Sequence, residues 1–158
     1  ELLVLDEPVA SLDPNARREF LRTLIHLIED PSRAVVFSTH ITSDLERVAT
    51  RLALLKEGRV SFCGELDTLK ERVKRLKISS DAALPADFSL PGALTCEVDG
   101  RLATVTVADF APELPDKIAT EWRVRVQVID LNLEEIFVEL HANHHSTEQE
   151  LQTTGVYQ

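Results

Sequence analysis

The sequence predicts an α/β fold in which a parallel sheet at the start is followed by a small α+β domain. Two apolar runs, LLVL (2–5) and AVVF (34–37), lie on either side of a helical pattern, which is the order of a strand–helix–strand unit with two parallel strands. Later strands alternate apolar and polar residues instead. No apolar run approaches the roughly 18 residues of a membrane helix, so no membrane span is expected.

The first strand runs directly into two carboxylates, Asp6 and Glu7. Four aliphatic residues in a row suit a strand that is buried on both faces, as in a parallel sheet covered by helices. A carboxylate pair at its end lies where open α/β sheets bind ligands. The simpler alternative is a strand that ends in a solvated acidic loop.

Asp13 and Pro14 predict a helix start, because a carboxylate suits the N-cap and proline the first helical position. Apolar residues then recur at helical spacing over 20–28. The second buried-strand pattern (34–38) leads into His40. Since the carboxyl ends of parallel strands meet at one edge of a sheet, the histidine and the two carboxylates are expected at the same edge.

A short helix is expected at 43–50, with Ser43 as its cap and Glu46 completing a capping box. Strands at 51–55 and 59–63 then form a hairpin.

Gly58 lies between these two strands and can supply the positive φ that a tight turn needs. An amphipathic helix is expected at 65–77, with a basic last turn, KRLK (74–77), that complements the helix dipole. The first domain, residues 1–77, is expected to end with this helix.

The second domain is expected over residues 78–142. Strands 93–98 and 101–107 are joined by Asp99 and Gly100, a type I′ hairpin signal. The elements expected after the hairpin are a helix at 112–121, a strand at 123–129 and a final helix capped by Asn132 with Glu135.

The last stretch, 143–158, is polar and aperiodic and is expected to be a disordered tail. The HANHH run (141–145) offers imidazole ligands for a metal, although solvated histidines are the commoner case.

The net charge of −10 lies almost entirely in the second half of the chain. Residues 1–78 carry 13 basic and 13 acidic side chains, whereas residues 79–158 carry 4 basic and 14 acidic ones. This asymmetry indicates two units and argues against nucleic acid as a partner of the second, since phosphate binding needs a basic face. Cys63 and Cys96 show no metal-ligand spacing and suit a reducing cytoplasm.

Three segments, in this order and spacing, resemble the ATP-binding-cassette (ABC) ATPases. LLVLDE (2–7) looks like the Walker B motif followed by the catalytic glutamate, ASLD (10–13) like the D-loop, and Thr39-His40 like the H-loop. The resemblance implies that residues 1–77 form a partial P-loop NTPase sheet, part of a truncated ABC nucleotide-binding domain.

Residues 78–142 are similar, more loosely, to the small C-terminal domain of bacterial exporter-type ATPases, which ends in a phrase like LNLEEIFVEL (131–140).

The resemblance implies ATP and Mg²⁺ as cofactors and gives each site residue a role. Asp6 holds the metal ion, because Mg²⁺ prefers hard carboxylate and water ligands. Glu7 faces away from Asp6 on the extended chain and orients and polarises the attacking water. His40 donates a hydrogen bond to the transferred phosphate. Ser11 and Asp13 belong to the D-loop, which contacts nucleotide at a two-cassette interface.

Each of these residues also has a structural explanation. Asp13 is fully accounted for as an N-cap, and a lone histidine after a strand is usually structural. The joint occurrence of Asp6, Glu7 and His40 at one sheet edge favours the catalytic interpretation.

Two family motifs are missing from the 158 residues. No G-x-x-x-x-G-K-[S/T] loop and no S-G-G-Q-like segment occurs, and the chain holds only five glycines. In the family both motifs precede Walker B. Because the chain also begins at Glu1 and contains no methionine, we expect it to be a fragment that is inactive alone.

The leading hypothesis is therefore an ATP-hydrolysing subunit of a bacterial ABC exporter. The resemblance implies a second nucleotide-binding subunit and a transmembrane permease as partners, and hence a cytoplasmic position on the inner face of the plasma membrane. The alternatives are a soluble, non-transport ABC ATPase of DNA repair or translation, and a non-catalytic regulatory or dimerisation module.

Overall fold

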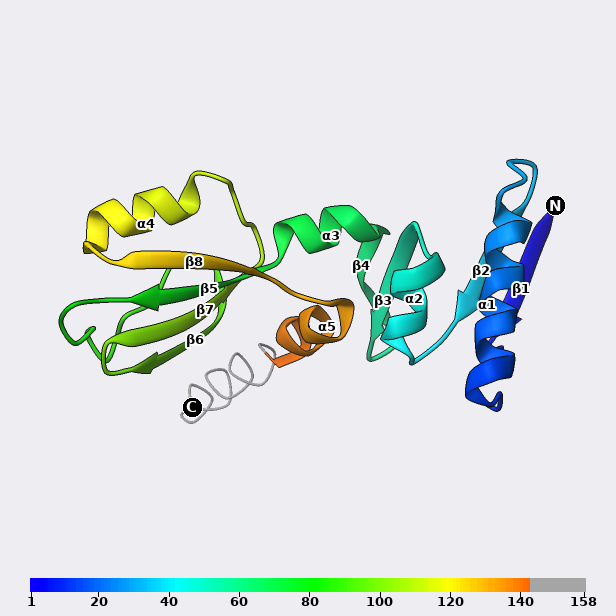
Figure 1. Cartoon of the computed structure of the whole chain (residues 1–158), viewed down its shortest axis with the longest axis horizontal. Coiled ribbons are helices and arrows are strands. Elements are labelled where there is room, and N and C mark those ends of the chain that lie inside the picture. Colours follow the sequence, from blue (N-terminus) through cyan, green and yellow to red (C-terminus); the bar gives the residue numbers. More distant parts are fainter. Residues whose placement is uncertain (143–158) are drawn as a thin grey trace, which may run out of the picture. The chain divides into compact units, whose positions relative to one another are not determined.

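The computed structural model describes residues 1–142 and divides into two compact units, the first Glu1–Leu66 and the second starting at Asp67 (Figure 1). The expected tail, 143–158, and most of the HANHH run lie outside the described residues. Among the described residues, no helix is long and apolar enough to cross a membrane.

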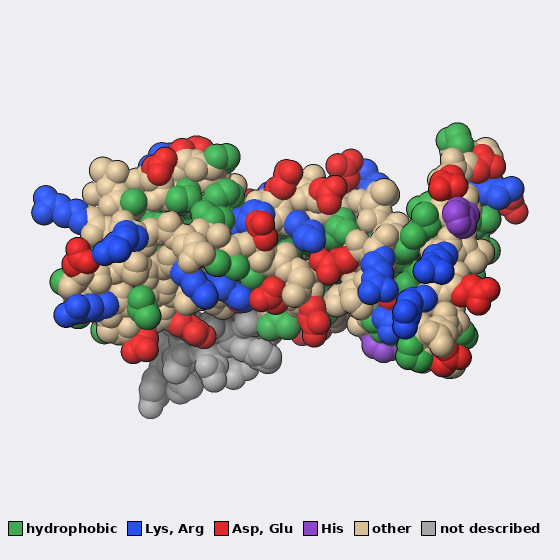
Figure 2. All heavy atoms as spheres, viewed as in Figure 1, with side chains coloured by type: hydrophobic (Ala, Val, Ile, Leu, Met, Phe, Trp, Pro, Cys, Tyr) green, Lys and Arg blue, Asp and Glu red, His purple; other side chains and the backbone are tan. Residues whose placement is uncertain are grey.

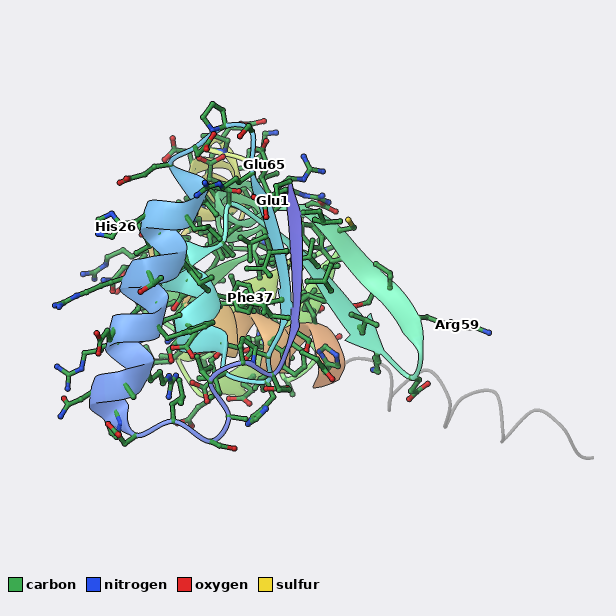
Figure 3. The ribbon with its side chains drawn as sticks, turned by 90° about the vertical axis from the view of Figure 1, so that its right-hand side faces the viewer. Glu1, His26, Phe37, Arg59 and Glu65 are labelled. Atoms are coloured by element: carbon green, nitrogen blue, oxygen red, sulfur yellow. The ribbon has the colours of Figure 1, made fainter. Side chains whose placement is uncertain are left out.

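The first unit opens with the predicted strand–helix–strand unit. Strand β1 (Leu2–Asp6) and strand β2 (Ala34–Ser38) pair in parallel and in register, from Leu2 opposite Ala34 to Asp6 opposite Ser38. Helix α1 (Pro14–Ile28) connects them and runs alongside both strands (Figure 3). The βαβ prediction is confirmed.

The expectation that the first strand is buried on both faces is wrong. Leu2 is 63% exposed and Val4 67%, and Val36 on the neighbouring strand is 57% exposed. The sheet contains two strands only, so most of its apolar surface meets no further layer among the described residues. Hydrophobic side chains accordingly reach the surface over this part of the chain (Figure 2).

Helix α2 (Thr42–Val48) begins one residue earlier than predicted, with Ile41 as its N-cap. The Ser43 cap is therefore wrong: the Thr39 hydroxyl accepts the Ile41 N–H at 3.1 Å, which turns the chain before Ser43 is reached.

Strands β3 (Arg51–Lys56) and β4 (Arg59–Glu65) form the predicted antiparallel hairpin. Glu57 and Gly58 both have positive φ, 49° and 74°, as a type I′ turn requires.

The predicted helix at 65–77 is wrong in its second half. Helix α3 (Leu66–Arg72) ends at Arg72, and Lys74–Ser79 is strand β5. β5 has strand neighbours on both sides, and its alternate residues Leu76 and Ile78 are buried, which is strand rather than helix periodicity. A domain boundary at residue 77 would cut this strand, whereas the compact units divide between Leu66 and Asp67.

The basic residues expected at a helix C-terminus lie on β5 instead, and two of them pair with carboxylates. Lys74 pairs with Asp130, and Arg75 with both Glu135 and Glu139.

The second unit is built on a four-stranded antiparallel sheet with the order β6-β7-β5-β8. The remaining elements are β6 (Ala93–Asp99), β7 (Leu102–Val107), α4 (Leu114–Trp122), β8 (Arg125–Asp130) and α5 (Leu133–Ala142). One sheet face packs with α4 and the loop residue Phe88 into an apolar core, and the other face bonds to α5. The buried core residues are Leu76, Ile78, Phe88, Leu90, Ala103, Val105, Val107, Ile118 and Val124.

The β6–β7 hairpin is confirmed, but its turn differs from the prediction. Asp99 pairs with Leu102, so the turn residues are Gly100 and Arg101. Gly100 has φ 58° and Arg101 does not have positive φ, the pattern of a type II′ turn rather than type I′.

The predicted cap of the last helix is confirmed. Asn132 Oδ1 accepts the Glu135 N–H at 2.9 Å, and the Glu135 carboxylate accepts the Asn132 N–H at 3.1 Å. This reciprocal pair is a capping box.

We expect backbone amides of β2 to exchange with solvent faster than those of β7 by about tenfold or more, which corresponds to an opening free energy lower by about 1.4 kcal/mol. β7 is an interior strand with a buried face, whereas β2 belongs to a two-stranded sheet with exposed faces. Hydrogen–deuterium exchange of 34–38 against 102–107 in a verified monomer measures the difference. Equal protection of the two strands would contradict it.

Candidate functional site

The candidate site begins where β1 and β2 end. Parallel register places Asp6 directly opposite Ser38. The Ser38 hydroxyl donates a hydrogen bond to Asp6 Oδ1 and accepts the Glu7 N–H at 3.0 Å. One hydroxyl thus fixes the carboxylate at the strand end and the backbone of the next residue.

Glu7 and His40 meet at this edge. The Nδ1 atom of His40 lies 3.1 Å from both Oε1 and Oε2 of Glu7. Because a carboxylate only accepts, Nδ1 carries the proton in this contact. The expectation that His40 lies at the same sheet edge as the two carboxylates is confirmed.

This contact bears on how His40 could act. With Nδ1–H donated to Glu7, the Nε2 atom of a neutral imidazole is an acceptor. Donation from His40 to a phosphate oxygen therefore needs either the imidazolium form or transfer of the Nδ1–H bond from Glu7 to the phosphate. The imidazole is 73% exposed, so both routes are sterically open.

The backbone of Glu7 is strained. Its φ is +44°, in the left-handed region that residues with a Cβ rarely adopt. The Glu7 carbonyl accepts the Ala10 N–H at 3.2 Å, which closes the turn after the strand. Residues held in such conformations cluster at active sites and ligand-binding sites.

Asp13 is the N-cap of helix α1, as its place before Pro14 predicts. Its Oδ1 accepts the N–H groups of Asn15 at 2.8 Å and Ala16 at 3.1 Å. These bonds, Ala16 first, lower the pKa of Asp13 from its ordinary value. Ser11 is exposed in the same turn. The hydrogen bonds that unite Asp6, Ser38, Glu7 and His40 include neither Ser11 nor Asp13.

The sequence reading missed an ion pair that ties the two loops of the site together. Arg17, in the first turn of α1, donates from Nε to both Asp44 oxygens at 2.9 and 2.8 Å, and from Nη2 to Oδ1 at 2.7 Å. Asp44 lies in the first turn of α2, and its side chain is only 2% exposed. The pair thus joins the helix after the Glu7 turn to the helix after His40.

A signal for this pair does exist in the sequence. Arg17 and Asp44 each lie four residues after a singled-out site residue, Asp13 and His40 respectively. Residues at that spacing fall in the first turn of the following helix. Ser38 could likewise be found as the last residue of the second apolar strand.

The arrangement offers hard oxygen ligands rather than a complete metal cage. Mg²⁺ is usually held by one or two carboxylates plus substrate phosphates, and the exposed Asp6 carboxylate beside the Ser38 hydroxyl fits that donor set. Among residues 1–142 there is no group of three or more His, Cys, Asp or Glu side chains that could hold a metal.

Part of the sequence is similar to ATP-binding proteins of ABC transporters. The chain is 42% identical over 72 residues to the uncharacterized ABC transporter ATP-binding protein YxlF of Bacillus subtilis (strain 168), covering 46% of this chain and 24% of that protein. It is 32% identical over 139 residues to the molybdenum import ATP-binding protein ModC 2 of Bradyrhizobium diazoefficiens, covering 84% of this chain and 15% of that protein.

A third relative is the uncharacterized ABC transporter ATP-binding protein all4389 of Nostoc sp. (strain PCC 7120), 36% identical over 69 residues, which cover 44% of this chain and 20% of that protein. The relatives of this chain are ABC transporter ATP-binding proteins. No protein-family model matches the sequence.

The matches span less than a quarter of the length of each of these three ABC relatives. The ModC 2 match covers 84% of this chain, which is more than either compact unit contains. That similarity therefore includes residues of both units.

We expect Asp44→Ala to lower the free energy of unfolding of the first unit by about 1–3 kcal/mol, because it leaves the Arg17 guanidinium, which is 28% exposed, without its hydrogen-bond acceptor. Urea unfolding followed by circular dichroism measures the loss. The matched control is Arg33→Ala, which removes exposed ion pairs with Glu1 and Asp30 and should cost less than about 1 kcal/mol. The double variant Arg17→Met/Asp44→Met should recover much of the loss, since neither charge is then left buried alone. An Asp44→Ala effect no larger than the control would contradict the assignment.

Proposed function

We propose that this chain carries the Walker B, D-loop and H-loop part of the ATPase subunit of an ABC transporter. The observation that supports this most directly is the Glu7–His40 contact beside Asp6, at the edge where two parallel strands end. ABC transporter ATP-binding relatives support the same class of reaction.

In the proposed reaction each residue at this edge has one task. Asp6 holds Mg²⁺, which when bound neutralises charge on the phosphate oxygens of ATP. Glu7 orients and polarises the attacking water, a role that its accepting carboxylate suits. His40 passes its Nδ1–H bond from Glu7 to the transferred phosphate, which leaves the Glu7 oxygens available to the water.

Ser11 and Asp13 are proposed to contact nucleotide across an interface with a second nucleotide-binding subunit. In Asp13, both N-cap bonds end on Oδ1, so this contact would be made by Oδ2 without loss of the cap.

The proposed partners are that second subunit and a transmembrane permease, which would place the chain at the cytoplasmic face of the membrane. The exporter type rests only on the looser resemblance of residues 78–142, and one relative is named a molybdenum import protein. A soluble non-transport ATPase is less well supported, because the relatives compared here are named for transport or as ABC transporter proteins.

Glu7→Gln in an ATPase subunit that contains this sequence should lower steady-state ATP hydrolysis by ~10²–10⁴-fold while leaving ATP binding unchanged. The amide keeps the shape of the side chain but no longer serves as a base. The measurements are phosphate release under saturating MgATP and the Kd for ATP. Glu19→Gln, an exposed carboxylate on α1, is the matched control and should hydrolyse ATP normally. Hydrolysis by Glu7→Gln at the control rate would sink the Glu7 assignment.

The 158-residue chain alone should not bind MgATP at micromolar concentration. The dominant phosphate contacts in P-loop proteins come from backbone N–H groups of a glycine-rich loop, and that motif does not occur in these 158 residues. Isothermal titration calorimetry of the chain with MgATP tests this. A saturable micromolar isotherm would show that the strand-end residues bind nucleotide without such a loop.

A further inference from the structure

The position of His40 depends on the helix that follows it more than on packing around its side chain. The imidazole is 73% exposed, so packing does little to hold the ring against Glu7. The backbone just after it is better fixed, because the Ile41 N–H donates to the Thr39 hydroxyl and the Asp44 N–H donates to the Ile41 carbonyl, both at 3.1 Å. The first turn of α2 therefore sets the direction in which the chain leaves His40.

The Glu7 side of the contact is connected to helix α1 in a similar way. The Glu7 carbonyl accepts the Ala10 N–H at 3.2 Å, and Val9 in the same turn is only 2% exposed. The Arg17 N–H then donates to the carbonyl of Asp13, the N-cap of α1, at 2.9 Å. A short path of hydrogen-bonded backbone thus leads from Glu7 to Arg17.

Arg17 and Asp44 join the far ends of these two paths. The Arg17 Nε atom donates to both oxygens of Asp44, at 2.9 and 2.8 Å, and Nη2 donates to Oδ1 at 2.7 Å. A guanidinium that contacts both oxygens of a carboxylate fixes the orientation of the two groups as well as their separation. The ion pair therefore closes a ring whose opposite side is the contact between Glu7 and His40.

We propose, on the basis of the function proposed above, that Arg17 and Asp44 are positioning residues that hold His40 against Glu7. Neither side chain takes part in the hydrogen bonds at the edge where β1 and β2 end, so both act through the two helices and not on ATP itself. A displacement of about 1 Å in a catalytic group can lower a rate by roughly a hundredfold. The orientation of this ion pair is therefore expected to affect hydrolysis.

The double variant Arg17→Met/Asp44→Met distinguishes a positioning role from a merely structural one. Replacing both partners of a buried ion pair by apolar side chains often leaves stability unchanged or raised. If the pair only holds the two helices together, hydrolysis should then be unaffected. If the pair sets the orientation of the helices, stability is retained while the rate of hydrolysis falls.

The first measurement is steady-state hydrolysis by an ATPase subunit that contains this sequence. The double variant should lower kcat by about ten- to a hundredfold and leave the KM for ATP within about twofold, because neither residue touches the nucleotide. The matched control is Asp30→Met/Arg33→Met, which removes an exposed ion pair just before β2, whereas the site lies at the other end of that strand. Its kcat should equal that of the unmodified subunit. A double variant with the kcat of the control overturns the proposal.

The second measurement uses the 158-residue chain and needs no ATP. Nitrogen NMR of the His40 ring, at a pH where the imidazole is neutral, reports which ring nitrogen carries the proton. In the unmodified chain and in the control this should be Nδ1, because Nδ1–H donates to Glu7. In Arg17→Met/Asp44→Met the contact should be lost and the proton should be shared with Nε2. An unchanged Nδ1–H form in the double variant overturns the proposal.

The ring measurement also separates this inference from the proposed function. If the unmodified subunit hydrolyses no ATP, the proposed function fails, and the protonated nitrogen of His40 alone decides whether the ion pair positions the ring. Asp44→Asn replaces the double variant if circular dichroism shows that the latter is unfolded, since the amide keeps the shape of the side chain and leaves Arg17 a single acceptor oxygen. It should change kcat and the His40 proton in the same direction, and no change in either overturns the proposal.

Discussion

Parallel, in-register pairing of β1 with β2 is the constraint on which the candidate site depends. It brings Asp6 opposite Ser38. The residues that follow the two strands, Glu7 and His40, therefore lie beside each other. An antiparallel pairing of the same two strands would send their carboxyl ends to opposite edges of the sheet. The ion pair between Arg17 and Asp44 extends this constraint, because it fixes the two helices that leave the edge.

The helix caps and the residues that lie at the candidate site's edge could be predicted from the sequence. The Asp13-Pro14 pair and the Asn132/Glu135 capping box are local signals, since every partner lies within a few residues. The location of Glu7 and His40 at one edge could be predicted because the carboxyl ends of parallel strands lie at the same edge of a sheet. Prediction failed where contacts between distant parts of the chain determine the secondary structure. The 65–77 segment satisfies helical spacing, but pairing with two strands makes its later part a strand.

Two other failures share one cause. Burial of the first strand was inferred from its apolar residues alone, and burial depends on what covers a strand, which a local pattern does not contain. The Arg17–Asp44 pair was missed for the same reason: 26 residues separate the two side chains in the sequence, and each resembles an ordinary charged helix residue. The β6–β7 turn differs from its prediction by one residue for a separate reason, because Gly100 can serve either hairpin geometry.

The left-handed backbone of Glu7 has a consequence for protein engineering. Glycine or asparagine would adopt that conformation at lower cost than glutamate. A screen that selects variants of this chain for thermal stability alone would therefore favour replacement of Glu7 and discard the carboxylate that faces His40. Stability and the proposed chemistry are in competition at this one position, and a consensus or stabilising design has to hold it fixed.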